Sequence, residues 1–497
     1  MKLVSQAFSF GFGTFISRIL GFLRDATVAY FFGASHITDA FFVAFRLPNS
    51  FRRLIGEGGF NAVFVPLYTR ALEEGKGAEF LARVFGFYIT SVGAITLFSV
   101  LFAELIIALI APGLLSSESY SLSVFMARFL FAYMILVGVS SMLMGILNVH
   151  GKFFIPALAQ AVFNGVFVII LLILAEILGY KALIVAVLLG GLFQVLINVP
   201  SLLRSHLLPG FRLEISDDIK KLLRRMVPAL GGFGVSQLSI FIDTFLASFV
   251  GRGAISYLYY AGRLYHLPFG LVSASIANSL LPLMSKKDAD RSSQLTDALR
   301  LIIILIIPSS AGLFMISEEI IDFIYGRGSF AYGDVLKASD VLAIYSLGLP
   351  FMSLQKVLTV PFFSRGDTST PLKSSLIMIS SEAVFASVFA FLLGLGLYGL
   401  PAGTSLSAVA GFVYLLRKKD EKVNGLKISK TLLKVICSTL LMSIFIFYIK
   451  GLNLPPSAVI LLSIFLGGLL YFGTLFVLGE SLSLRIFKSF IEKVRNP

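Results

Sequence analysis

Charged residues stand inside apolar stretches near the start of this chain, and one more stands in a later apolar stretch. They are Arg18, Arg24, Asp25, Asp39, Arg46, Arg52, Arg53, Glu57 and Arg263. A charge at the centre of a bilayer costs roughly 2.5–3.5 kcal/mol, so such residues usually face a wet cavity or a partner. The arginines outnumber the carboxylates, which indicates an anionic ligand. The structural alternative is an internal ion pair, such as Arg24 with Asp25 or Asp39.

Arginine suits phosphate because its planar fork can hold two oxygens at once. Three or four converging arginines would therefore bind a diphosphate. Pro48 should break the second apolar stretch, since proline lacks an N–H donor and clashes with the preceding turn. Beyond that break Arg53 and Glu57 can pair at i,i+4, so we predict that Arg53 is structural and that Arg52 faces the cavity.

Two further carboxylates, Asp243 and Glu382, lie in apolar stretches of the second half of the chain. Oxygen ligands of this kind suit a hard cation, so they are a candidate Na⁺ or H⁺ site. A hydrogen-bonded contact between helices is the equally weighted alternative.

The composition predicts an all-α integral membrane protein. Of 497 residues, 57% are apolar and 14% are charged, against roughly a quarter charged in soluble domains. The net charge of +14 fits basic cytoplasmic loops better than a nucleic-acid partner. A single cysteine, four histidines without a ligand motif and no phosphate-binding loop predict no disulfide, transition metal, nucleotide or other cofactor.

Glycines, prolines and charge runs divide the sequence into about 14 transmembrane spans. We predict them near residues 4–32, 37–68, 82–112, 121–149, 154–178, 181–203, 227–250, 254–284, 297–323, 335–363, 371–395, 398–416, 431–450 and 457–479. Lysine and arginine gather in alternate loops, which places both termini in the cytoplasm. The expected location is the cell inner membrane.

An internal repeat relates the two halves. Polar residues that align between them are Asp25 with Asp243, Arg46 with Arg263 and Asn61 with Asn278. Parallel repeats of this kind commonly enclose a central site and alternate its access. The predicted domains are two six-helix lobes at 1–205 and 227–418, a cytoplasmic amphipathic linker at 206–226, and two added helices with a basic tail at 419–497.

Several motifs resemble the MurJ (MviN) family of lipid II flippases, which belongs to the multidrug/oligosaccharidyl-lipid/polysaccharide exporter superfamily. They are Ser17–Asp25, Thr38–Phe41, Phe51–Phe60 and Tyr259–Leu264 followed by Leu281 and Pro282. The resemblance covers essentially the whole chain. It implies a V-shaped pair of bundles around a cationic cavity, with a groove for the lipid tail formed by the last two helices.

The resemblance also implies roles for residues. It places Arg18, Arg24, Arg52 and Arg263 on the substrate diphosphate and makes Asp39 necessary for function. We add Ser17, Asp25 and Asp39 to the substrate-binding set and assign gating or structural roles to Arg53, Glu57, Gly58 and Asn61. Asp243 matches an acidic residue of a sodium site in part of the family, whereas Glu382 and Ala386 depart from that site. The coupling ion could be Na⁺ or H⁺, or the membrane potential could act alone.

The resulting hypothesis is a monomeric flippase, not an enzyme, that contacts membrane lipids and moves lipid II by alternating access. The nearest alternative is a flippase for another polyprenyl-diphosphate saccharide, such as an O-antigen or capsule unit. A drug or cation antiporter of the same superfamily should have an acidic or aromatic cavity instead. A membrane enzyme acting on lipid diphosphates would need a carboxylate pair or a nucleophile with its base, and neither stands out.

Overall fold

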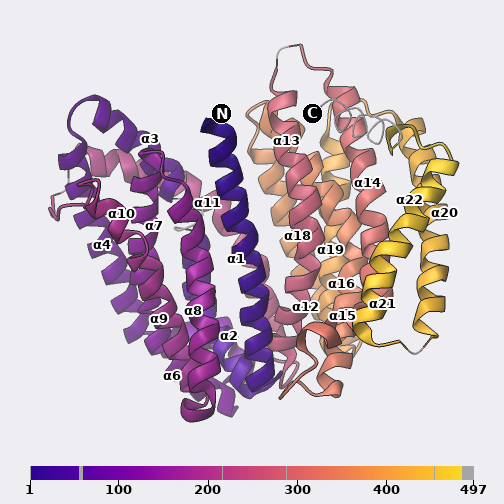
Figure 1. Cartoon of the computed structure of the whole chain (residues 1–497), viewed down its shortest axis with the longest axis horizontal. Helices are drawn as coiled ribbons and strands as arrows, with labels where there is room; N and C mark the ends of the chain where they lie inside the picture. Colours follow the sequence, from indigo (N-terminus) through magenta and orange to yellow (C-terminus); the bar gives the residue numbers. More distant parts are fainter. Residues whose placement is uncertain (1, 55–59, 215, 287, 453, 484–497) are drawn as a thin grey trace. The chain divides into compact units, whose positions relative to one another are not determined.

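The computed structural model describes residues 2–54, 60–214, 216–286, 288–452 and 454–483, with backbone alone for 2–12, 14 and 227–236. Within these ranges the only regular secondary structure is helical (Figure 1). Helices suit apolar sequences in a membrane because they satisfy every backbone polar group internally. The prediction of an all-helical membrane protein is confirmed.

The chain divides into two compact units, Met1–Ser256 with Arg327–Phe330, and Tyr257–Gly326 with Ala331–Pro497. The first unit contains α1 (Lys2–Phe32), α2 (His36–Phe51), α3 (Phe60–Glu73), α4 (Gly77–Leu101), α5 (Ala103–Ile110), the short helix η2 (Pro112–Leu114), α6 (Glu118–Leu130), α7 (Tyr133–Val149), α8 (Phe154–Leu178), α9 (Lys181–Leu196), α10 (Val199–Leu203) and α11 (Asp217–Ala247). The second half of the predicted linker, from Asp217 on, is continuous with the following span in α11, and α11 belongs to the first unit.

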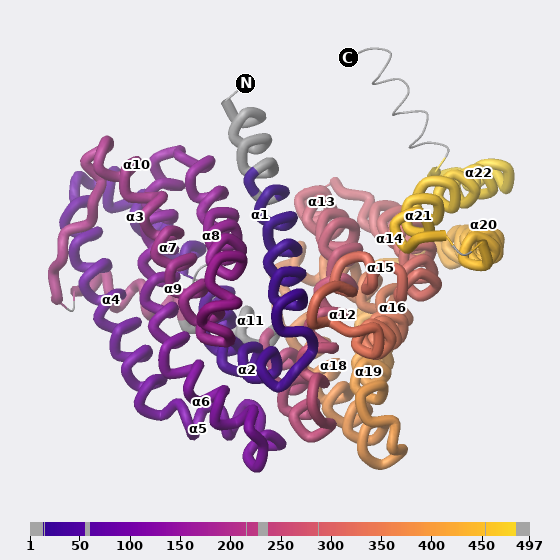
Figure 2. The backbone as a smooth tube through the Cα atoms, turned by 60° about the horizontal axis from the view of Figure 1, so that its bottom comes forward, coloured from indigo at the N-terminus to yellow at the C-terminus, as the bar shows by residue number. Residues whose placement is uncertain are grey.

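The second unit begins within α12 (Ala254–Pro268). It continues through η3 (Phe269–Ser273), α13 (Ala274–Met284), α14 (Arg291–Met315), α15 (Ser317–Tyr325), α16 (Tyr332–Leu358), α17 (Val360–Ser364), α18 (Ser369–Ser387), η4 (Val388–Leu392), η5 (Gly396–Tyr398), α19 (Gly399–Lys418), α20 (Gly425–Lys450), α21 (Pro456–Leu462), η6 (Ser463–Gly467) and α22 (Gly468–Val477). Inside the units, α8 packs on α9 and α18 packs on α19, as consecutive spans of a repeat should (Figure 2).

Eleven helical segments of the described chain are long and apolar enough to cross a membrane. Helices α1, α2 with α3, and α11 fall outside this set, and they carry most of the charged candidates. The total of 14 spans stays a prediction.

The prediction that the helix breaks at Pro48 is wrong. Helix α2 continues through Pro48 to Phe51, and a π turn at 52–54 follows. A membrane helix tolerates an internal proline because neighbouring groups satisfy the freed backbone carbonyl. Arg52 is therefore the C-terminal cap of α2 rather than the start of a separate segment.

The last two predicted spans dock onto α14 and α15 through an apolar seam. Helix α20 packs on α14, α22 packs on α20, and α21 packs on α15. Buried residues of the seam are Ile303, Ile304, Ile316, Val435, Met442, Ile446, Ile449, Val459, Tyr471 and Leu475. The hydroxyl of Tyr471 donates to the carbonyl of Ile304 at 2.7 Å, which fixes the position of α22 along α14.

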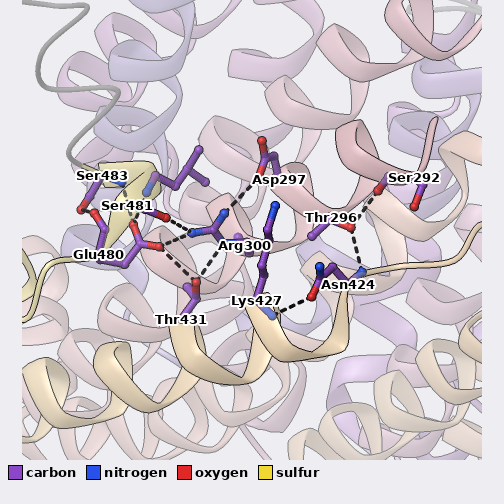
Figure 3. Close-up of polar contacts among 11 residues, drawn as sticks. Ser292, Thr296, Asp297, Arg300, Asn424, Lys427, Thr431, Glu480, Ser481 and Ser483 are labelled. Carbon is purple, nitrogen blue, oxygen red and sulfur yellow. Dashed lines mark hydrogen bonds and ion pairs between the residues drawn. The ribbon is translucent and has the colours of Figure 1, made fainter. Parts of the chain in front are cut away.

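A buried ion pair closes one end of this seam (Figure 3). The Arg300 Nη2 group lies 2.5 Å from Glu480 Oε1, and the two residues are only 3% and 1% exposed. Arg300 Nε also donates to Thr431 Oγ1 at 2.9 Å, and the second Glu480 oxygen accepts the N–H of Ser483 at 2.7 Å. Burial alone would raise the pKa of Glu480, but the Ser483 N–H and the Arg300 guanidinium outweigh it and hold that pKa below 4.5.

Removing one member of this pair should destabilise the protein, because it leaves an uncompensated buried charge. Arg300→Met is expected to cost on the order of 3–5 kcal/mol, and Arg300→Met with Glu480→Leu should recover part of that loss. Circular dichroism during thermal unfolding of the solubilised protein measures the effect. Lys427→Met, at an exposed position on α20, is the control and should stay within roughly 0.5 kcal/mol.

The stability lost in Arg300→Met should also depend on pH. Because the pKa of Glu480 is lowered on folding, its stabilising contribution is present above pH 4.5 and is lost as the pH falls through the lowered pKa. The difference in free energy of unfolding between wild type and Arg300→Met should therefore become smaller in acid. A difference that stays constant, or an Arg300→Met protein as stable as wild type at neutral pH, would contradict a stabilising pair.

Candidate functional site

Helix α8 provides the polar face on which the first two arginine-bearing helices meet. Helix α1 packs closely along α8, and Gly13 permits the approach. A Cβ added at Gly13 would lie 2.8 Å from the Ala157 Cβ, which is closer than packed side chains allow. This small-residue contact brings the following turns of α1 within hydrogen-bonding reach of α8.

Arg24 is held between its sequence neighbour and α8. Its Nη2 and Nε lie 2.7 and 3.0 Å from Asp25 Oδ1, and its Nη1 donates to Asn164 Oδ1 at 3.3 Å. The Asn164 amide donates in turn to the Ser17 carbonyl at 3.1 Å. The guanidinium carbon lies 5.8 Å from the centroid of the Phe167 ring. The ion pair considered from the sequence therefore exists, and it leaves Arg24 half-buried rather than enclosed.

Arg52 reaches the same helix one turn away. Its Nη1 donates to Gln160 Oε1 at 3.2 Å, and its Nη2 donates to Asn49 Oδ1 at 3.1 Å. Gln160 and Asn164 are four residues apart, so they lie on one face of α8. Arg52 and Arg24 consequently meet α8 at positions separated by about one helical turn, or about 5.4 Å.

Arg18 lies on the same helix as Arg24, about 120° from it around the helix axis. Its side chain is exposed, and it makes no hydrogen bond or ion pair with any residue that the structure describes. The first unit thus groups Ser17, Arg24, Asp25 and Arg52 around α8, with Arg18 on the same helix as Arg24. Neutral amides already hold two of the guanidinium groups, and a phosphate would offer stronger, charge-assisted bonds to them.

Asp39 has a different position from these arginines. Its carboxylate is 1% exposed and accepts the Gly253 N–H at 2.6 Å, the Ser256 N–H at 2.9 Å and the Ser256 hydroxyl at 2.7 Å. Thr38 Oγ1 lies 2.8 Å from the same hydroxyl. These donors belong to the first turn of α12, where a negative charge is favourable. Asp39 therefore fastens the start of α12 to the start of α2.

The other candidates are more dispersed. Arg263 is half-buried on α12 in the second unit. Arg53 lies in the π turn after α2, and Asn61 on α3 donates to the Ser141 carbonyl at 3.5 Å. Glu57 and Gly58 lie outside the described residues.

The two carboxylates of the predicted cation site belong to different units. Asp243 lies on α11 in the first unit and Glu382 on α18 in the second. Glu382 is fully buried and accepts the Thr404 hydroxyl at 3.1 Å. Among the described residues, no group of three His, Cys, Asp or Glu side chains is placed to hold a metal ion. The Na⁺ or H⁺ site stays a prediction.

Sequence reasoning missed four partners, Gln160, Asn164, Gly253 and Ser256. Gln160 and Asn164 could have been found from the sequence, because two polar residues at i,i+4 are unusual within an apolar helix such as α8. Gly253 and Ser256 could not, since only the folded chain shows which helix start receives the Asp39 carboxylate.

Replacing Asp39 by asparagine should weaken this junction. Asparagine keeps only one acceptor oxygen, so its NH2 group must face either the Gly253 N–H or the Ser256 N–H, at a cost of roughly 1–3 kcal/mol for the donor left unsatisfied. Thermal unfolding of the purified variant tests this. Asp217→Asn, at an exposed position in the first turn of α11, is the matched control and should change stability little. Equal losses in both variants, or none in Asp39→Asn, would refute the anchoring role.

Comparison with known proteins places this geometry in a family. The family model described as lipid II flippase MurJ matches residues 28–467. A probable lipid II flippase MurJ of Aquifex aeolicus is 44% identical over 423 residues, 85% of each chain. A probable lipid II flippase MurJ of Buchnera aphidicola is 33% identical and covers 92% of each chain.

Solved structures agree with the sequence comparison. A lipid II flippase MurJ in an inward closed conformation matches with a TM-score of 0.83 and 29% identity, covering 97% of this chain and 99% of that one. An inward-facing multidrug resistance transporter, described as of the MATE family and the MOP superfamily, matches with a TM-score of 0.68 and 16% identity, covering 84% of this chain and 95% of that one. The second likeness shows the fold alone. The chain is a multi-pass membrane protein that belongs to the MurJ family of lipid II flippases.

Proposed function

We propose that this protein moves lipid II, the polyprenyl-diphosphate-linked cell-wall precursor, across the cytoplasmic membrane. The observation that supports this most is that Arg24 and Arg52 donate to amides on neighbouring turns of α8. Arg18, on the same helix as Arg24, is exposed. A diphosphate carries several oxygens that such groups can share. The names of the relatives point to the same substrate.

The cycle follows from the chemistry of the substrate. Arg18, Arg24 and Arg52 hold the diphosphate, with Arg263 as a fourth contact, while the polyprenyl tail stays in lipid. Asp25 orients Arg24 and keeps the empty site from accumulating unbalanced positive charge. The carrier then alternates between states open to the two sides of the membrane, and no covalent bond changes.

The location and topology belong to the same proposal. Both termini lie in the cytoplasm, since basic residues gather in alternate loops and at the C-terminal end. The protein acts as a monomer in the inner membrane and recognises no nucleic acid. Moving one charge through about 100 mV supplies roughly 2.3 kcal/mol, so the membrane potential can bias the cycle.

The substrate proposal is tested in cells depleted of their own flippase. A membrane-impermeant enzyme that degrades lipid II reports its exposure on the outer face. Wild type should restore exposure, whereas Arg24→Ala should reduce it by roughly tenfold or more, because a charge-assisted contact is worth about 1.5–3 kcal/mol. Arg128→Ala, which removes an exposed arginine paired with Glu104, is the control and should behave as wild type.

Arg24→Ala protein that reaches the membrane and restores full exposure would refute the site. Wild-type protein present in the membrane without any exposure would refute the substrate. In that case another polyprenyl-diphosphate saccharide is the next candidate, and competition among lipid-linked sugars for binding would identify it. Recovery of an intact diphosphate after turnover distinguishes transport from enzymatic cleavage.

Cation coupling through Glu382 is a separate expectation. A buried carboxyl group beside the Thr404 hydroxyl can exchange a proton or contribute to a Na⁺ site. In liposomes containing the protein, transport should respond to an imposed H⁺ or Na⁺ gradient, and Glu382→Gln should abolish the response. If wild type responds to neither gradient, the membrane potential alone drives the cycle, whereas a Glu382→Gln variant that responds normally would show that Glu382 does not couple the cation.

A further inference from the structure

An apolar groove runs along the α18–α19 pair of the second unit. Its volume is about 440 Å³, within the range of roughly 300–1,000 Å³ typical of small-molecule sites. The lining residues are Ile377, Phe385, Leu406, Val409, Ala410, Val413, Tyr414 and Arg417. Every lining side chain but the last two is purely apolar, so the groove suits a hydrocarbon chain.

The length of the groove matches one leaflet of a bilayer. Along α19 it extends from Leu406, near the middle of the helix, to Arg417, next to its last residue. Eleven residues of helix rise about 16 Å, and half of a hydrocarbon core of about 30 Å is about 15 Å. A chain lying in the groove would therefore run from the headgroup level to the middle of the membrane.

Two basic residues stand at the headgroup end. Arg417 lies in the groove, and Lys373 lies one turn before Ile377 on α18, which runs antiparallel to α19. Both side chains are exposed, and neither forms a hydrogen bond or ion pair with any residue that the structure describes. Tyr414 adds a hydroxyl at the same level, where tyrosine is favoured at membrane interfaces.

Close helix packing makes the groove a fixed feature rather than a loose gap. Gly399 and Gly403 of α19 face Ala390 and Ala386, and a Cβ added at Gly403 would lie 2.3 Å from the Ala386 backbone nitrogen. The two helices also touch nearer the basic end, where the Ser374 hydroxyl donates to the Gly411 carbonyl at 3.1 Å, so the groove runs along a tightly packed pair.

We propose that this groove is a binding site for an anionic phospholipid of the membrane. One acyl chain lies against Ile377, Ala410 and Val413, and the phosphate binds the guanidinium of Arg417 and the ammonium of Lys373. Charge selects the headgroup, because two unpaired cations favour an anionic lipid over a zwitterionic one. The site is distinct from the arginine site for the transported substrate and does not depend on which lipid-linked saccharide is moved.

Native mass spectrometry of the delipidated full-length protein tests the proposal without lipid II present. Phosphatidylglycerol and phosphatidylcholine are added separately, and bound lipid is counted. Wild type should retain phosphatidylglycerol preferentially, and Lys373→Ala with Arg417→Ala should lower its retention roughly tenfold. Lys427→Ala with Lys430→Ala, at exposed positions on α20, is the matched control and should retain wild-type binding.

A second variant separates the groove from surface charge. Val413→Trp should fill the groove and reduce phosphatidylglycerol binding while leaving both basic residues in place, and thermal unfolding confirms that it folds. A photo-crosslinking residue at Leu406, which is exposed at the mid-membrane end, should give an adduct with phosphatidylglycerol. Equal retention of the two lipids by wild type, unchanged binding in both groove variants, or an adduct with a second copy of the chain would overturn the proposal.

Discussion

The cost of placing a guanidinium group among apolar helices governs the first unit of this protein. Arg24 and Arg52 need partners there, and α8 provides them through two amides on one face. The amides are neutral, so they stabilise the arginines without cancelling their charge. Asp25 balances one of them. An anion can therefore find guanidinium groups that are already positioned, which lowers the entropy lost when it binds.

The same constraint explains how much the sequence could predict. Repeated apolar runs identify a helical membrane protein directly, and the motifs around Arg24, Asp39, Arg52 and Arg263 together identify the family. Eleven helical segments of the described chain are long and apolar enough to cross a membrane, which confirms the class, and the total of 14 spans stays a prediction. Pro48 does not end its helix, because membrane helices accommodate prolines that would disrupt a soluble one.

The site itself was only partly predictable. Arg24 and Arg52 were recognised by type and position, since charge in an apolar stretch is visible in one dimension. Their partners on α8 lie more than a hundred residues away, so only the packing of α1 on α8 reveals them. Asp39 was grouped with the substrate-binding residues, yet its carboxylate is occupied by the first turn of α12. Its importance for function would then arise from anchoring rather than from substrate contact.

The central claim is that the arginines of the first unit carry a diphosphate lipid across the membrane. It is tested most directly with purified protein in liposomes that contain fluorescent lipid II. An external quencher then measures how much of the fluorescent lipid reaches the outer leaflet. The account predicts that wild type renders the inner-leaflet lipid accessible to the quencher, and that the Arg18→Ala, Arg52→Ala double variant does not. If the double variant, correctly folded, transports lipid II at the wild-type rate, the arginine face has no part in transport and the account fails.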